Sequence, residues 1–174
     1  MKQALTVAAL LFAFAPPSSA QDACARNVES GFSYCPPEGW TMKPALGDKF
    51  KPFIGPPSPT FTPNINIKDE ESTRSLDDHV AANIQTMVGS PDKAGAMAVR
   101  ILEQSDFKTT SGERVVRVTI RVNTSSGAPI RAWQYYFKGR GTQYLVATCM
   151  SLESSADSYE PICDRSMRTL RVDR

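Results

Sequence analysis

His79 is the only histidine in the chain, and it stands near the acidic run Asp69, Glu70 and Glu71. A histidine grouped with carboxylates can act as a general base or help to bind a metal ion. The acidic run lacks the spacing of a calcium loop, however, and is typical of a solvated turn. We expect His79 itself to be half-exposed, because it lies one position off the apolar stripe of a predicted helix. A metal-dependent or other hydrolase that uses His79 with these carboxylates is therefore the alternative hypothesis for function.

Polar residues alternate along one predicted strand and form a candidate anion site. Arg117, Thr119 and Arg121 share a face of that strand, and Gln134 and Tyr136 lie on the next strand. Two arginines with amide and hydroxyl neighbours can hold a carboxylate or a phosphate. The competing interpretation is a solvated sheet face, or arginines stacked over the edge of a helix. We take Arg117, Arg121 and Gln134 as the ligand-binding candidates.

The sequence predicts no catalytic residue, no metal site and no cofactor. It contains no Gly-x-Ser-x-Gly segment to present a serine nucleophile. It also lacks a glycine loop for phosphates, since Gly139-Arg140-Gly141 is typical of a hairpin turn.

The four cysteines, Cys24, Cys35, Cys149 and Cys163, are expected to form two disulfides. Metal binding would need close pairs such as C-x-x-C, and the spacings of 11 and 14 residues supply none. Three pairings are possible. We favour the local pairing, Cys24 with Cys35 and Cys149 with Cys163, in which the second bond would join the last strand to the last helix.

The first 20 residues are typical of a cleavable export signal. A single basic residue, Lys2, precedes an apolar run that ends at Ala15, and Ser18 and Ala20 occupy the small-residue positions before a cut. The run is shorter than the roughly 20 apolar residues of a membrane-spanning helix. A retained N-terminal anchor is the alternative. We expect residues 1–20 to be removed and a periplasmic or extracellular protein to begin at Gln21.

Residues 21–174 are long enough for one domain with a substantial core. Loss of Lys2 leaves 19 Lys and Arg against 18 Asp and Glu, a formal charge of +1. Such a balance gives no long-range attraction to nucleic acid. No further apolar stretch is long enough for membrane insertion of the mature form.

Two helices and a meander are predicted after a Pro-rich first third. Ser75 can cap the start of the first helix, and Asp78, three residues later, can return the hydrogen bond. This helix is expected to end near 89–91. The second begins near Ser154 and fits Pro161 only if that residue lies in the first turn. Four strands lie between them, at 99–107, 114–123, 130–138 and 142–150. Their connections are too short for parallel crossovers, so the fold class is α+β, an antiparallel sheet with a four-strand meander flanked by helices.

The order of these segments resembles the PsbP-like family. The relevant features are Gly39-Trp40, a Pro-rich loop, the strand Asn64–Ile67, the helix start Ser75–His79, the meander and a closing helix with Tyr159 and Pro161. The resemblance spans residues 31–172 and implies an α/β/α sandwich. The characterised members of the PsbP-like family are mostly binding or assembly proteins that catalyse no reaction.

We therefore expect an exported, non-catalytic binding or envelope-assembly domain. Its partner would be an envelope or extracellular protein, a peptide or a small molecule, held by the sheet face or by the Pro-rich loop. The lone histidine and the lack of a tight catalytic constellation favour this hypothesis over the hydrolase.

Overall fold

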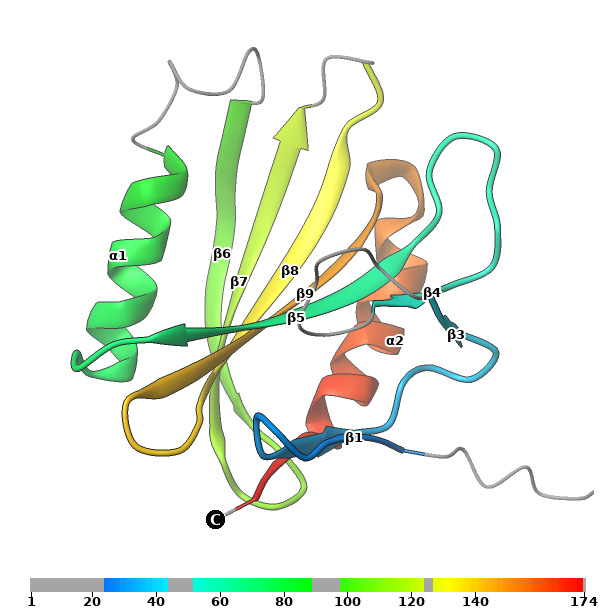
Figure 1. The fold of residues 1–174 in the computed structure, drawn as a ribbon. Helices are drawn as coiled ribbons and strands as arrows, with labels where there is room; N and C mark the ends of the chain where they lie inside the picture. The colour runs from blue at the N-terminus through cyan, green and yellow to red at the C-terminus, as the bar shows by residue number, and fades with distance from the viewer. Residues whose placement is uncertain (1–23, 44–51, 89–97, 124–126, 174) are drawn as a thin grey trace, which may run out of the picture.

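The computed structural model describes residues 24–43, 52–88, 98–123 and 127–173 (Figure 1). The predicted signal peptide, the cleavage point at Gln21 and the predicted end of the first helix lie outside these residues. In chain order the elements are β1 (Ala25–Asn27), β2 (Phe32–Tyr34), β3 (Thr41–Met42), β4 (Phe53–Ile54), β5 (Asn64–Glu71), α1 (Leu76–Val88), β6 (Ala98–Lys108), β7 (Arg114–Asn123), β8 (Ile130–Lys138), β9 (Gln143–Leu152), the 3-10 turn η1 (Glu153–Ser155), α2 (Ala156–Arg168) and β10 (Arg171–Val172).

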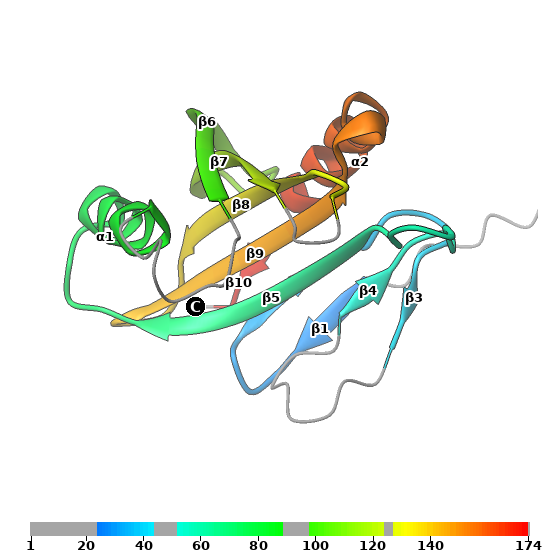
Figure 2. The ribbon, with the colours of Figure 1, turned by 90° about the horizontal axis from the view of Figure 1, so that it is seen from above.

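The main sheet has seven strands in the order β3-β4-β5-β9-β8-β7-β6, each antiparallel to its neighbours. The predicted four-strand meander is confirmed, and strands β7 and β8 have the predicted bounds. Figure 2 shows the long strand β5 beside β9, continuing the sheet toward β4 and β3. A separate three-stranded sheet, β1-β2-β10, brings the N-terminal segment next to the C-terminus.

One helix covers each face of the meander, which makes the molecule an α/β/α sandwich of the predicted α+β class (Figure 1). The face toward α1 buries Val116, Val118 and Ile120, which alternate along β7 with Arg117, Thr119 and Arg121. The opposite face buries Trp133 and Tyr135, among others, against α2 and the N-terminal strands. Both faces of β8 and β9 are therefore apolar, because both are covered.

Helix α1 begins with the predicted serine cap. The backbone N–H of Asp78 donates to Ser75 Oγ at 3.2 Å, and Ser75 Oγ donates to the Asp78 carboxylate at 2.7 Å. The cap satisfies one of the free N–H groups of the first turn. It fixes the start of α1 directly after β5.

Helix α2 differs from the prediction at Pro161. This residue is the sixth of the helix rather than part of its first turn, so it cannot donate to the carbonyl of Asp157. Both residues are exposed, so water can solvate that carbonyl. On the other side of the helix Cys163 and Met167 are fully buried, and this packing offsets the cost of an interior proline.

Candidate binding site

A groove of about 700 Å³ runs between α2 and the segment that follows β2. Pro36 and Pro37 line one side, and Tyr159 and Ile162 of α2 line the other. Trp40 also lines it, with its ring edge-on to that of Tyr159 at a centroid distance of 6.3 Å. A concave, mostly apolar surface of this volume is typical of a ligand site.

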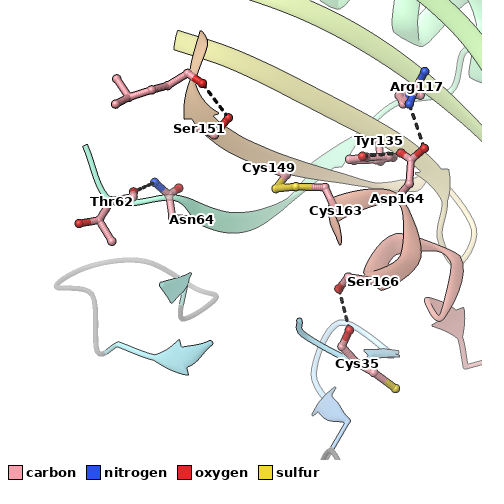
Figure 3. The surroundings of a disulfide bond; sticks show 11 residues. Cys35, Thr62, Asn64, Arg117, Tyr135, Cys149, Ser151, Cys163, Asp164 and Ser166 are labelled. Atoms are coloured by element: carbon pink, nitrogen blue, oxygen red, sulfur yellow. Dashed lines mark hydrogen bonds and ion pairs between the residues drawn. A yellow bond between two sulfur atoms is a disulfide. The ribbon is translucent and has the colours of Figure 1, made fainter. Parts of the chain in front are cut away.

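The N-terminal wall is fastened to α2 by two side chains of the helix end. Ser166 Oγ donates to the backbone carbonyl of Cys35 at 2.6 Å (Figure 3). The backbone N–H of Cys35 donates to Thr169 Oγ1 at 2.8 Å. The same cysteine is joined to Cys24 in the predicted disulfide. Cys35 thus anchors this wall by its backbone and by its side chain.

The second disulfide, Cys149–Cys163, fastens the α2 wall to the sheet, with the Cα atoms 6.2 Å apart (Figure 3). Both cysteines are fully buried. The pairing is the one that the spacing favoured, and it joins the last strand to the last helix. Both walls of the groove are therefore covalently restrained, which reduces the entropy cost of ordering a site around a ligand.

Gly55 lies close against the ring of Trp40, which lines the groove. A Cβ atom at this glycine would lie 2.9 Å from Trp40 Cε2, a distance that real Cβ atoms do not adopt. Any other residue at this position would displace the indole. The sequence shows Gly55 only as a glycine in a Pro-rich loop. Its contact with Trp40 could not be predicted, because Trp40 lies 15 residues away in the chain.

The predicted anion site is divided by the structure. Arg117 faces α2, where it donates to Asp164 at 2.9 Å (Figure 3). It also donates to Glu160 at 2.7 Å. Tyr135 also donates to Asp164, at 2.7 Å. Burial alone would lower the pKa of Arg117, but the charges of Asp164 and Glu160 outweigh it and raise the pKa. Arg117 is thus an internal tie between sheet and helix.

Gln134 lies on the other face of the sheet from both arginines, contrary to the prediction. It pairs in register with Val118, whereas Arg117 pairs with Tyr135. Residues directly opposite in an antiparallel pair point to the same face, so Gln134 belongs to the α1 side. There it accepts a hydrogen bond from Tyr136 Oη at 2.6 Å. The three candidates do not form one site.

His79 is buried, with 5% of its surface exposed, and the prediction of a half-exposed residue is wrong. Its ring stacks on Tyr144 at a centroid distance of 4.3 Å, and its Nε2 lies 2.9 Å from Glu70 Oε2. Asn83 donates to the same carboxylate oxygen at 3.1 Å. The helical stripe did not indicate this, because the covering groups come from β5 and β9.

Only one of the three carboxylates named with His79 reaches it. Asp69 and Glu71 alternate with Glu70 along β5 and face the other side of the sheet. Asp69 instead accepts a hydrogen bond from Gln143, and Glu71 accepts one from Thr142. Within the described residues no three His, Cys, Asp or Glu side chains are grouped so as to hold a metal ion.

No protein-family model and no curated protein sequence matches the chain. Several solved structures share its fold. The chain covers 91% of the cyanobacterial PsbP protein (CyanoP) of Synechocystis sp. PCC 6803, with a TM-score of 0.62, 12% identity and 86% of this chain aligned. LpqN of Mycobacterium tuberculosis, described as involved in cell envelope biogenesis, aligns over 87% of this chain and 90% of its own, with a TM-score of 0.61 and 10% identity. The Saccharomyces cerevisiae Ran-binding protein Mog1p aligns over 86% and 94%, with a TM-score of 0.58 and 9% identity.

Proposed function

Since this chain has the PsbP-like fold, we propose that it is an exported, envelope-associated binding domain without catalytic chemistry of its own. The observation that supports this most is the groove beside α2, whose two walls are each held by a disulfide. A catalytic site needs reactive groups that a substrate can reach. The groove presents mainly prolines, aromatic rings and hydroxyl groups, with Glu38 and Arg165 as its charged residues, and this lining suits recognition of a protein, a peptide or a small molecule.

Several features support a location of the mature protein outside the cytoplasm. Disulfides persist in oxidising compartments, and the chain has two of them. The residues before Gln21 have the pattern of an export signal. One structural neighbour, LpqN, is described as acting in cell envelope biogenesis, and another, Mog1p, as binding Ran.

The hydrolase alternative receives less support from the geometry. His79 is enclosed by Tyr144, Tyr136 and Glu70, so its ring is part of the packing between α1 and the sheet. A histidine that acts as a general base must reach the proton that it removes.

Site-specific photocrosslinking in the producing cell tests the proposal. A crosslinker at Ser158, which is exposed on the groove, should capture a defined partner from the cell envelope. The matched control is Gln85, exposed on α1 on the opposite side of the sheet. If the ligand is a small molecule, native mass spectrometry of the protein purified from its own cell envelope should detect it as an added mass.

The Arg165→Glu substitution, which reverses a charge on the groove, should remove the Ser158 adduct or the bound ligand. Identical adducts from Ser158 and Gln85, or binding that is indifferent to Arg165→Glu, would contradict a groove-based function.

A further inference from the structure

Three arginines stand in one row across the meander. Strand β6 pairs Arg100 with Arg121 of β7, and β7 pairs Arg121 with Arg131 of β8. Side chains directly opposite in an antiparallel sheet lie about 4.5–5.5 Å apart at Cβ and point to the same face. Like charges in these positions repel one another, so the row needs compensating negative charge.

A β-bulge creates this row. The register shifts between Ile101 and Glu103, so that Leu102 is an extra residue on β6. Arg100 pairs with Arg121, and Glu103 pairs with Thr119, two residues away from Arg121 on β7. Arg100 and Glu103 therefore point to the same face of the sheet. Without the bulge, the period of two would place Arg100 and Glu103 on opposite faces. Bulges are frequent next to functional sites, where they redirect a side chain.

The carboxylates that make hydrogen bonds on this face are bound to Arg131 and Arg117. Arg131 is held by both oxygens of Glu153. Arg117 takes Glu160, Asp164 and Glu103. In the part of the chain that the structure describes, neither the side chain of Arg100 nor the guanidinium of Arg121 makes a hydrogen bond or an ion pair.

Arg121 leaves a buried donor unsatisfied. Its Nε is inaccessible to solvent and has no hydrogen-bond partner within the described residues. A buried polar group without a partner costs about 1–3 kcal/mol, and more when it is charged. Asp157, in the first turn of α2, acts on Arg131 through its charge, but its side chain is exposed and forms no hydrogen bond or ion pair with the described residues of the row.

The neighbouring row contains two more buried polar atoms of this kind. Thr119 Oγ1 and Trp133 Nε1 belong to residues that face each other across β7 and β8, on the same face as Arg121. Both side chains are almost fully buried, and both atoms lack partners within the described residues. An N–H, an O–H and a guanidinium therefore occur in adjacent rows, and all of them can donate to an oxyanion.

We propose that Arg121, together with Arg100, forms an anion-binding site for the carboxylate or phosphate group of a ligand. The planar guanidinium donates two parallel hydrogen bonds to such groups, and the bound charge offsets the repulsion along the row. The hydrogen bond from Arg131 and, in addition, the charge of Arg121 lower the pKa of Glu153, so Arg121 lies within electrostatic range of that carboxylate without bonding to it. This site is separate from the groove, and it stands or falls independently of the proposed function.

Nuclear magnetic resonance titration of the mature protein tests the site, with sodium phosphate and sodium acetate as probes. Ionic strength is held constant with sodium chloride. The signals of interest are the Arg121 Nε–H and the Trp133 indole N–H. The chain has only one other tryptophan, Trp40, and its indole signal serves as the internal reference.

We expect saturable shifts of both signals, with Trp40 unaffected. Arg121→Gln should weaken binding at least tenfold, and Arg100→Gln, at an exposed position, should weaken it while leaving the fold intact. The matched control is Arg171→Gln, which removes an exposed charge from β10 and should change nothing. A response to both probes identifies a general oxyanion site, and a response to phosphate alone identifies a phosphate site.

Absence of a shift, a shift that grows linearly without saturation, or equal affinity in Arg100→Gln and Arg171→Gln would overturn the proposal. Because Arg100 is exposed, the comparison of these two variants holds even if Arg121→Gln does not fold.

Discussion

At the residue scale, His79 links three elements in a way that its own helix does not show. Its ring lies between Tyr144 of β9 and Glu70 of β5, and Asn83, one turn further along α1, donates to the same carboxylate. Tyr136 of β8 meets the ring edge-on at 6.2 Å. The histidine therefore contributes to packing and to a buried polar contact together.

We predict that His79→Ala destabilises the folded state by about 2 to 3 kcal/mol, because it removes a stacked ring and leaves Glu70 without one of its partners. Urea unfolding followed by circular dichroism measures this. Gln85→Ala, at an exposed position of the same helix, should change stability by less than about 0.5 kcal/mol. Equal effects of the two substitutions would show that the His79 contacts contribute little.

Glu70 should make stability depend on pH. Burial would raise its pKa, but the hydrogen bond and charge of Lys68, with smaller contributions from Asn83 and His79, lower it below the usual range. A carboxyl whose folded-state pKa is lowered stabilises the protein above the unfolded value of about 4.3, and this contribution is lost as pH falls through the lower folded value.

We therefore expect the urea midpoint to fall as pH is lowered from about 5 to 3, and Glu70→Gln to reduce that fall. Some pH dependence should remain, because Arg131 also lowers the pKa of Glu153. A midpoint whose pH dependence is unaltered by Glu70→Gln would contradict this account.

At the element scale, α2 is held to the sheet by two different kinds of bond. Arg117 of β7 reaches Glu160 and Asp164, and Cys149 of β9 is bonded to Cys163. Near its end, α2 also holds the N-terminal wall of the groove through Ser166. Loosening this helix should therefore disturb the groove as well as the core.

We predict that Cys163→Ser lowers the free energy of unfolding by about 2–5 kcal/mol, because it removes the cross-link and leaves a hydroxyl in a buried position. Denaturant unfolding gives the magnitude, and limited proteolysis should show earlier cleavage in α2. As a control, replacing both Cys24 and Cys35 by serine should free β1 while α2 stays protected. A non-reducing peptide map that links Cys149 to Cys24 or Cys35 would refute the pairing.

At the scale of the whole molecule, the chain is one sandwich in which both ends meet. Strand β10 pairs with β2, so the C-terminal residues close the same small sheet that begins the described chain. Arg26 of β1 forms an ion pair with Asp173 at 3.2 Å. The two ends of the described chain, Cys24 and Asp173, are therefore joined through this small sheet.

We predict that the mature protein begins at Gln21, because Ser18 and Ala20 provide the small residues that signal peptidase requires. N-terminal sequencing of protein recovered from outside the cytoplasm measures this directly. A mature form that still carries Lys2 would instead indicate a retained anchor.

The sequence alone determined the features that depend on local backbone periodicity. The alternation in 114–123, the apolar run in 130–138 and the turn residues between them predicted two strands with their observed bounds. The serine cap of α1 was equally local. The strand and cap signals lie within a few residues of one another, where strand and helix geometry is nearly invariant. The cysteine pairing was favoured by spacing but not determined, since three pairings were possible, and the structure has the favoured one.

Only the tertiary structure decided which side chains meet across elements. Gln134 was assigned to the wrong face because the register of β7 with β8 depends on their connection, and a shift of one residue exchanges the two faces. Arg100 lies in the arginine row because of a bulge in β6. The bulge changes which residues of the strand point to each face, and the sequence of β6 does not indicate where it occurs. His79 and the groove depend on how helices from different parts of the chain pack on a twisted sheet, and that packing is a property of the whole molecule.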